Sequence, residues 1–334
     1  MKRLLAAACA AACLVTAAAP AQAQALQDVK FTLDFISLGR HAPWYVALGK
    51  GYFKEEGLNV TILPSKGTAD AIRAVATGAS EFGFIDVPSL IAAGSAGSTV
   101  KIVAASYQKP PYCVFSLNPG ANIDSAKKLV NLELGTSSAS FVPKIWAAIM
   151  EMNGIDSKTM KVVNIDPAAR VPMLASRKVA SIDLFMMSEP AIRRAVPDAK
   201  PVCLFAGDLG LDIYANSIGV NADYLKKNPE IVKKFVRAAA RGWKDTFANP
   251  DEATKIQLQY VKALDPQIVK EELEILKRIA LTPEVQKNGF GYITPEKMRR
   301  TVDFINKNIE VSGDRLTAEQ VYVPGYLPEK PILP

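Results

Sequence analysis

Short apolar runs rich in β-branched and aromatic residues alternate with segments of helical spacing, and no other feature restricts the fold of this chain as strongly. Strands are predicted over 29–36, 58–64, 81–86 and 100–106, with helices over 43–53, over 68–77 and from Pro88. Strands separated by helices form βαβ units, whose right-handed crossovers build a parallel sheet. The pattern therefore predicts an α/β protein.

A second series of the same kind follows the first and repeats its layout. Strands are predicted over 113–117, 132–136, 161–166, 181–187 and 201–205, with helices over 139–153, from Pro167 and from Glu189 or Pro190. The stretches 71–91 and 170–192 share one order: helix, small-residue turn, apolar strand, then an acid near a proline that opens a helix. Two similar lobes are therefore expected.

From about Asn221 onward the pattern becomes entirely helical, and this segment completes the predicted domain organisation. We expect lobe 1 to contain residues 25–108 and 212–334, and lobe 2 to contain residues 109–211. The chain would cross between the lobes near 107–112 and 207–214. A ligand would lie between the lobes, at the carboxyl ends of the strands.

The N-terminal segment has the pattern of a cleavable secretion signal over residues 1–23. Lys2 and Arg3 precede an apolar run that is too short to span a bilayer, and Ala21 to Ala23 supply the small residues of a cleavage site. We therefore expect the mature chain to be soluble outside the cytoplasm, in the periplasm.

Charge and cysteine content exclude several classes of function. The net charge of +7 falls to +5 when Lys2 and Arg3 leave with the signal, and the remaining excess is not gathered into basic runs, so nucleic-acid binding is not expected. One histidine and two mature cysteines give no metal cluster. Cys113 and Cys203 are either paired in an oxidising compartment or both free and buried.

Candidate ligand-binding residues lie where a strand gives way to a helix, because the first N–H groups of a helix are unpaired and carry partial positive charge. In lobe 1 the second junction offers a cation, a glycine for close backbone approach and an N-cap: Lys66, Gly67 and Thr68. In lobe 2 the hydroxyl-rich junction 136–140 offers an anion or carbonyl cradle, with Ser137, Ser138 and Ser140.

Two acids and several aromatic residues complete the predicted site. Asp86 and Glu189 occupy comparable places in the two lobes, where both would accept hydrogen bonds from ligand N–H groups. Trp44 or Tyr45, at the first junction, would stack on the ligand, and Tyr214 is a further candidate on the return crossing.

The stretches 40–60 ("RHAPWYVALGKGYFKEEGLNV"), 67–91 and 186–192 ("MMSEPAI") resemble the NMT1/THI5-like group of periplasmic substrate-binding proteins. The resemblance implies the bilobal type II periplasmic-binding-protein fold, closing on a small-molecule solute and delivering it to an inner-membrane ABC permease. We expect a monomer without a cofactor and without catalytic residues. His41 stands where the branch that binds thiamine pyrimidine precursors carries a histidine, so the resemblance implies that His41 contacts the ligand.

The resemblance leaves three ligand or function classes open. A flat heteroaromatic or amide-bearing solute, such as a thiamine pyrimidine precursor, suits Asp86 and Glu189. An organosulfonate, taurine or an aromatic acid would instead require Lys66, Arg40 or Arg170 to dominate the site. The third class is the pyrimidine synthase of the same group, an enzyme that consumes a histidine; a lone histidine without a readable catalytic partner argues against it.

Overall fold

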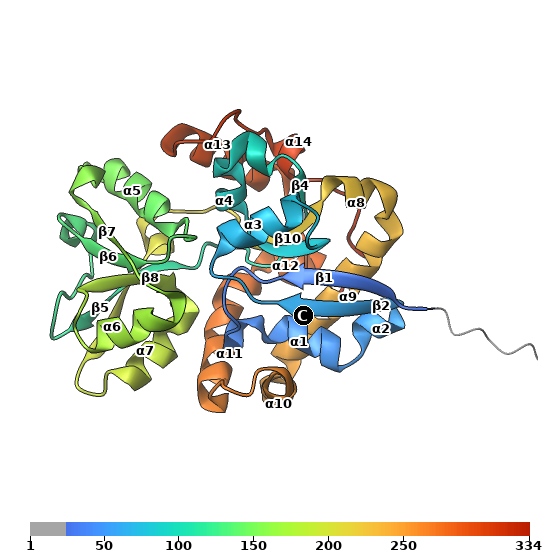
Figure 1. Cartoon of the computed structure of the whole chain (residues 1–334), viewed down its shortest axis with the longest axis horizontal. Coiled ribbons are helices and arrows are strands. Elements are labelled where there is room, and N and C mark those ends of the chain that lie inside the picture. The colour runs from blue at the N-terminus through green and yellow to red at the C-terminus, as the bar shows by residue number, and fades with distance from the viewer. Residues whose placement is uncertain (1–24) are drawn as a thin grey trace, which may run out of the picture.

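The computed structural model describes residues 25–334, which form two five-stranded sheets in two lobes (Figure 1). The predicted secretion signal over residues 1–23 lies outside the described residues. No helix within residues 25–334 combines the length and the apolar character that a membrane crossing requires. Within the same residues, no group of three or more His, Cys, Asp or Glu side chains is arranged to hold a metal ion.

The sheet of lobe 1 has the strand order β2-β1-β3-β10-β4. Its strands are β1 (Gln27–Thr32), β2 (Leu58–Leu63), β3 (Phe82–Asp86), β4 (Val100–Ala105) and β10 (Asn216–Asn221). The helices that connect them are α1 (Ala42–Gly49), α2 (Tyr52–Glu55), α3 (Thr68–Ala76) and α4 (Val87–Ala92). The single helix predicted over 43–53 is two helices, because Gly51 adopts a left-handed conformation with φ of 78° between them.

The sheet of lobe 2 has the strand order β7-β6-β8-β5-β9. Its strands are β5 (Tyr112–Asn118), β6 (Glu133–Thr136), β7 (Lys161–Asn164), β8 (Ser181–Phe185) and β9 (Lys200–Phe205). The helices of this lobe are α5 (Val142–Met152), α6 (Arg170–Ala175) and α7 (Glu189–Ala195).

Both sheets are mixed, which corrects the prediction of purely parallel sheets. β10 is antiparallel to β3 and β4, and β5 is antiparallel to β8 and β9. β5 and β10 are the first strands after the chain crosses from the other lobe. They are not preceded by a crossover helix of their own lobe, which is the connection that imposes the parallel direction.

The C-terminal helices pack on lobe 1 and complete its core (Figure 1, yellow to red). They are α8 (Ala222–Lys227), α9 (Pro229–Ala248), α10 (Pro250–Tyr260), α11 (Pro266–Ala280), α12 (Pro283–Asn288), α13 (Pro295–Asn308) and α14 (Ala318–Val321). The apolar stripe of α9 buries Val232, Phe235 and Trp243, and Phe235 stacks on Phe82 of β3 with ring centroids 4.0 Å apart.

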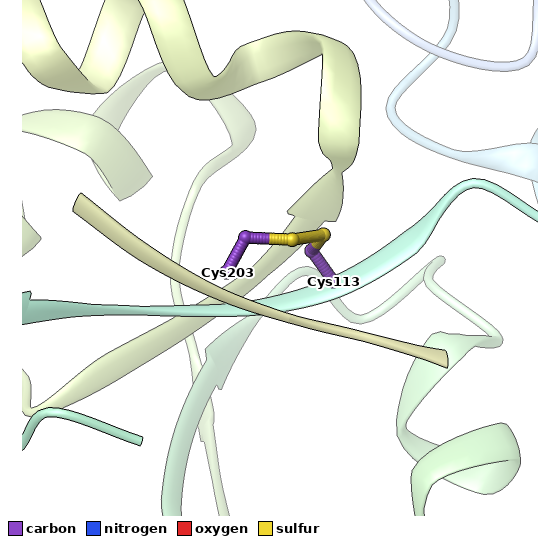
Figure 2. The surroundings of a disulfide bond; sticks show 2 residues. All are labelled: Cys113 and Cys203. Carbon is purple, nitrogen blue, oxygen red and sulfur yellow. A yellow bond between two sulfur atoms is a disulfide. The ribbon is translucent and has the colours of Figure 1, made fainter. Parts of the chain in front are cut away.

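Cys113 of β5 and Cys203 of β9 form a disulfide, with their Cα atoms 5.5 Å apart (Figure 2). This pairing resolves the two alternatives that the sequence leaves open. β5 receives the chain arriving from lobe 1, and β9 precedes its return to lobe 1. The disulfide therefore links the two strands of lobe 2 that lie next to the interlobe crossings.

Candidate functional site

A cavity lies between the two lobes, lined by residues of both. Lobe 1 lines it with a set of mainly polar residues: Asp34, Phe35, Arg40, Gly67, Thr68, Asp86, Ser89 and Asn216. Lobe 2 lines it with hydroxyl, aromatic and charged residues: Tyr112, Ser137, Ser140, Phe141, Val142, Arg170, Asp183, Leu184 and Phe185. A concave site that combines aromatic and aliphatic side chains with converging polar groups is typical of small-molecule binding.

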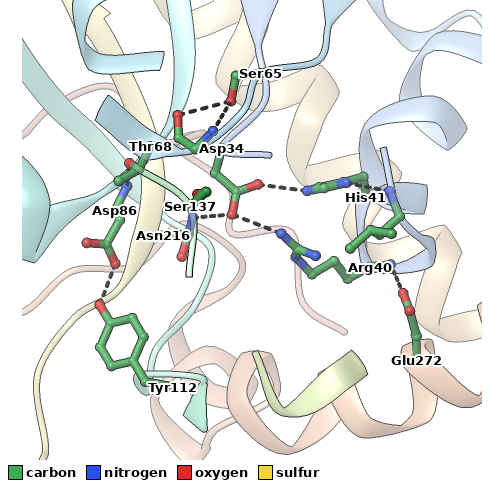
Figure 3. A network of polar contacts seen from close by, with 12 residues as sticks. Asp34, Arg40, His41, Ser65, Thr68, Asp86, Tyr112, Ser137, Asn216 and Glu272 are labelled. Carbon is green, nitrogen blue, oxygen red and sulfur yellow. Dashed lines mark hydrogen bonds and ion pairs between the residues drawn. The ribbon is translucent and has the colours of Figure 1, made fainter. Parts of the chain in front are cut away.

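The first polar group of the cavity is centred on Asp34, two residues beyond the end of β1 (Figure 3). Its carboxylate accepts hydrogen bonds from Arg40 Nη2 at 3.2 Å and from Asn216 Nδ2 at 2.9 Å, and it bonds His41 Nε2 at 2.7 Å. Burial opposes the charge of Asp34, but the Arg40 guanidinium and the His41 hydrogen bond together hold its pKa below the ordinary value. Asp34 and Arg40 therefore form a buried ion pair.

His41 supports Asp34 and does not line the cavity, contrary to the prediction that it contacts the ligand. Its side chain is fully buried. The Leu38 N–H donates to Nδ1 at 3.0 Å, so Nε2 carries the proton and donates to Asp34. Burial, together with the charge of Arg40, lowers the pKa of His41 to about 4, and the ring is therefore neutral at physiological pH.

The second polar group belongs to lobe 2 and is centred on Asp183, in the middle of β8. Its carboxylate accepts hydrogen bonds from Arg170 Nη1 at 2.5 Å, Thr136 Oγ1 at 2.9 Å and Ser140 Oγ at 2.7 Å. Arg170 Nη2 also donates to Ser137 Oγ at 3.3 Å. The Arg170 and Asp183 side chains are almost completely buried, so each lobe contributes one buried arginine–aspartate pair.

Asp86 is different, because no lysine, arginine or histidine pairs with it among the described residues. It is the last residue of β3, and its Oδ1 accepts hydrogen bonds from the backbone N–H and the hydroxyl of Ser89 at the start of α4. Its Oδ2 accepts the hydroxyl hydrogen of Tyr112, which belongs to lobe 2. Burial raises the pKa of Asp86 above the ordinary value for an aspartate.

Phe35 and Phe185, which the sequence does not single out, are two of the aromatic residues that line the cavity. The Arg40 guanidinium lies 4.9 Å from the Phe185 ring centroid, and the Arg170 guanidinium lies 5.0 Å from that of Phe35. These cation–π contacts join an arginine of each lobe to a phenylalanine of the other.

Trp44 and Tyr45, predicted to stack on a ligand, lie away from the cavity. Trp44 is fully buried against Phe31, Phe84 and Trp243, with ring centroids 4.7–5.5 Å away. Tyr45 packs on Tyr260, and its hydroxyl hydrogen-bonds with that of Ser37 at 2.8 Å. Both rings are core residues, because α1 packs against the sheet on one side and against the C-terminal helices α9 and α10 on the other.

Four further predicted residues lie outside the cavity lining. Lys66 is exposed, and its contact with the loop of lobe 2 is made by its backbone carbonyl, which accepts a hydrogen bond from Ser137 Oγ at 3.2 Å. Ser138 is also exposed and lines a neighbouring surface groove. Glu189 pairs with Arg193 one helical turn along α7, at 3.1 Å. The buried ring of Tyr214 lies near α13, and its hydroxyl accepts the Thr294 N–H at 2.8 Å.

The remaining predicted residues, Gly67, Thr68, Asp86, Ser137 and Ser140, line the cavity together. The two junction loops also touch where the lobes meet. The Ala69 N–H donates to the Ala139 carbonyl at 3.5 Å, and a Cβ added to Gly67 would lie 2.7 Å from that same oxygen. A side chain at position 67 would therefore separate the lobes, so glycine is needed there for close approach.

The sequence contains one indication of the two buried aspartates, Asp34 and Asp183, which were not among the predicted site residues. Asp34 and Asp183 each interrupt an apolar stretch of a predicted strand, between Leu33 and Phe35 and between Ile182 and Leu184. A carboxylate flanked by buried apolar residues is rare unless it is paired, so each acid indicates a nearby cationic partner.

The sequence of this chain is similar to those of known proteins. The family described as NMT1/THI5 like matches residues 39–253. The riboflavin-binding protein RibY of Chloroflexus aurantiacus is 30% identical over 88% of this chain and 85% of its own length. The formylaminopyrimidine-binding protein of Halalkalibacterium halodurans is 26% identical over 85% of this chain and 86% of its own length.

An enzyme and a solved structure are also similar to the chain. The 4-amino-5-hydroxymethyl-2-methylpyrimidine phosphate synthase of Legionella pneumophila is 23% identical over 91% of this chain and 93% of its own length. The alkanesulfonate-binding protein SsuA of Xanthomonas axonopodis pv. citri superimposes with a TM-score of 0.69 at 13% identity, over 90% of this chain and 99% of its own. The chain therefore belongs to the NMT1/THI5-like family and has the two-lobed fold of periplasmic binding proteins.

Proposed function

We propose that this protein is the solute receptor of an ABC importer, working in the periplasm as a monomer. Its two lobes close on one small, flat solute that carries N–H donors, such as a pyrimidine related to thiamine precursors, and closure presents both lobes to an inner-membrane permease. The similarity to two solute-binding proteins supports the class of function. The contents of the cavity support the class of solute.

The main support for this class of solute is the environment of Asp86. This residue is a buried carboxylate at the cavity, and within residues 25–334 its only partners are Ser89 and Tyr112. A buried carboxylate without a cation is costly unless hydrogen-bond donors surround it. The amino or ring N–H groups of a solute would supply further donors. Burial raises the pKa of Asp86 and so disfavours its ionised form. N–H donors of a solute would oppose this rise, because they stabilise the charged carboxylate.

The rest of the cavity suits a flat, neutral solute. Phe35 and Phe185 offer apolar surface for a ring. The charges of Arg40 and Arg170 are already balanced by Asp34 and Asp183, so a net negative charge on the solute is not required to stabilise them. The buried Nε atoms of both arginines have no hydrogen-bond partner among the described residues, so each would be free to donate to a solute oxygen that reached it.

The same two Nε atoms favour a second candidate, an organosulfonate or an aromatic acid, whose oxygens would bind between Arg40 and Arg170. Asp86 opposes it, because its buried carboxylate has no cationic partner among the described residues and would repel an anion. The synthase reading has less support: both ring nitrogens of His41 are engaged within the protein, and no lysine is among the cavity-lining residues.

Thermal denaturation with a panel of compounds tests the class of solute. The panel contains riboflavin, 4-amino-5-hydroxymethyl-2-methylpyrimidine, formylaminopyrimidine, alkanesulfonates and aromatic acids. A solute at one hundred times its dissociation constant stabilises the folded protein by about 2.7 kcal/mol, which raises the melting temperature by several degrees. We expect the aminopyrimidines to produce the largest shift. A shift with sulfonates alone would contradict the proposal.

The substitution Asp86→Asn tests the role of the carboxylate. Hydrogen bonds to a charged group contribute about 1.5–3 kcal/mol, so the affinity for the pyrimidine that binds wild type should fall about 10- to 100-fold in calorimetry. Asparagine also caps helices well, so the start of α4 should remain intact. Asp303→Asn, an exposed residue on α13, is the matched control. An unchanged affinity of the Asp86→Asn protein would remove the basis of the proposal.

A further inference from the structure

Glu272 lies on α11, in the C-terminal helical region, far along the sequence from the residues that line the cavity. Its side chain is almost completely buried, with 2% of the residue exposed. One carboxylate oxygen, Oε2, accepts the Arg40 backbone N–H at 2.9 Å (Figure 3). Glu272 itself does not line the cavity.

The carboxylate of Glu272 sits at the start of the one-turn 3-10 helix η1 (Gly39–His41), which carries Arg40 to the cavity and His41 to Asp34. The residue that precedes this turn is Leu38, whose apolar side chain cannot accept the free N–H groups of the turn. Glu272 Oε2, which comes from a distant part of the sequence, accepts the Arg40 N–H in place of a side chain at position 38. A Cβ added to Gly39 would lie only 2.7 Å from Oε2, so the glycine allows this close approach.

We propose that Glu272 is a positioning residue of the solute site: its carboxylate fixes the 39–41 turn so that Arg40 and His41 hold Asp34 in place. The proposal rests on the proposed function, because it assigns Glu272 to the same cavity. It connects the helical C-terminal region to the binding loop through one buried acceptor.

The groups that face Glu272 explain how its charge is held. Arg40 is the cation beside it, and Tyr107 is the other titratable group in electrostatic contact with it. The other charges on α11 are engaged elsewhere or exposed: Glu271 pairs with Arg193 of α7, Lys270 with Asp251 of α10 and Lys277 with Glu274, and Arg278 is exposed. Burial raises the pKa of Glu272 to about 7, although Arg40 and the backbone N–H groups of the turn oppose this rise. The charge on this acceptor therefore changes near neutral pH.

Amide hydrogen exchange of the ligand-free protein tests the proposal without requiring a solute. We compare wild type with Glu272→Leu, which removes the acceptor, and with Glu272→Gln, which keeps an uncharged one. Glu274→Leu, on the exposed side of the same helix, is the control. We expect the Arg40 amide to exchange at least about tenfold faster in Glu272→Leu, with partial rescue in Glu272→Gln and no change in the control.

The pH profile separates positioning by the charged carboxylate from simple packing. In wild type, corrected for intrinsic exchange, the protection of the Arg40 amide should fall several-fold between pH 8 and pH 6, as Glu272 becomes neutral. In Glu272→Gln it should stay constant and match the low-pH value of wild type. Unchanged Arg40 exchange in Glu272→Leu, or an equal pH dependence in wild type and Glu272→Gln, would overturn the proposal.

Calorimetry with 4-amino-5-hydroxymethyl-2-methylpyrimidine connects the turn to binding. Glu272→Leu should weaken the affinity about tenfold or more, and Glu272→Gln less, whereas Glu274→Leu should bind like wild type. A loosened turn with unchanged affinity would overturn the positioning role. If wild type binds none of the pyrimidines, the proposed function fails, while the exchange experiment still decides whether Glu272 holds the turn.

Discussion

Replacing Asp34 with asparagine should lower the free energy of unfolding by about 3–5 kcal/mol, because it leaves the buried Arg40 guanidinium without its counter-ion. Asparagine cannot accept from Arg40, His41 and Asn216 together as the carboxylate does. Urea denaturation at pH 7, followed by circular dichroism, measures the loss. Solute affinity should fall as well, since Arg40 and Asn216 both line the cavity.

The control for this substitution is Asp198→Asn, which breaks the exposed ion pair with Arg177 and should cost less than about 1 kcal/mol. The pH dependence gives a second check. Because the pKa of Asp34 is lowered in the folded protein, its contribution is complete above pH 3.8 and is lost as the pH falls through the lowered value. The difference between wild type and Asp34→Asn should therefore narrow below pH 3.8. A loss under 1 kcal/mol at pH 7 would refute the buried ion pair as a stabilising element.

Removing the disulfide with Cys113→Ala and Cys203→Ala together should lower the free energy of unfolding by about 3–5 kcal/mol. The cross-link spans 90 positions of sequence, and closing so long a loop restricts the unfolded chain strongly. Thermal and urea denaturation of the double variant, compared with wild type in reducing and oxidising buffer, measures the effect.

Reduced wild type should unfold like the double variant, and reductant should not change the double variant further. Both results follow if the cross-link acts mainly by restricting the unfolded chain. Equal stability of wild type and the double variant under oxidising conditions would show that the disulfide is not a stabilising cross-link.

The alternation of strand and helix patterns was sufficient to predict the two-lobed architecture, because periodicity depends on local burial and needs no knowledge of tertiary partners. The directions of β5 and β10 were not predictable in this way. Each enters its sheet from the other lobe, and the direction of such a strand depends on the crossing.

The candidate site was predicted in part, for a similar reason. Residues whose role depends on the backbone of a strand-to-helix junction, such as Gly67, Thr68 and Ser137, lie at the cavity. Trp44 does not, because the C-terminal helix α9 brings Trp243 against it and makes it core. Asp183 was overlooked because its partner Arg170 lies 13 positions away and meets it only after folding.

A crystal structure of the complex with the compound that most raises the melting temperature would show where the solute binds. We expect one solute in the cavity between the lobes, with its ring against Phe35 and Phe185 and an N–H group donating to Asp86. A solute bound on the outer surface of one lobe, or one in the cavity without any contact to Asp86, would contradict this expectation.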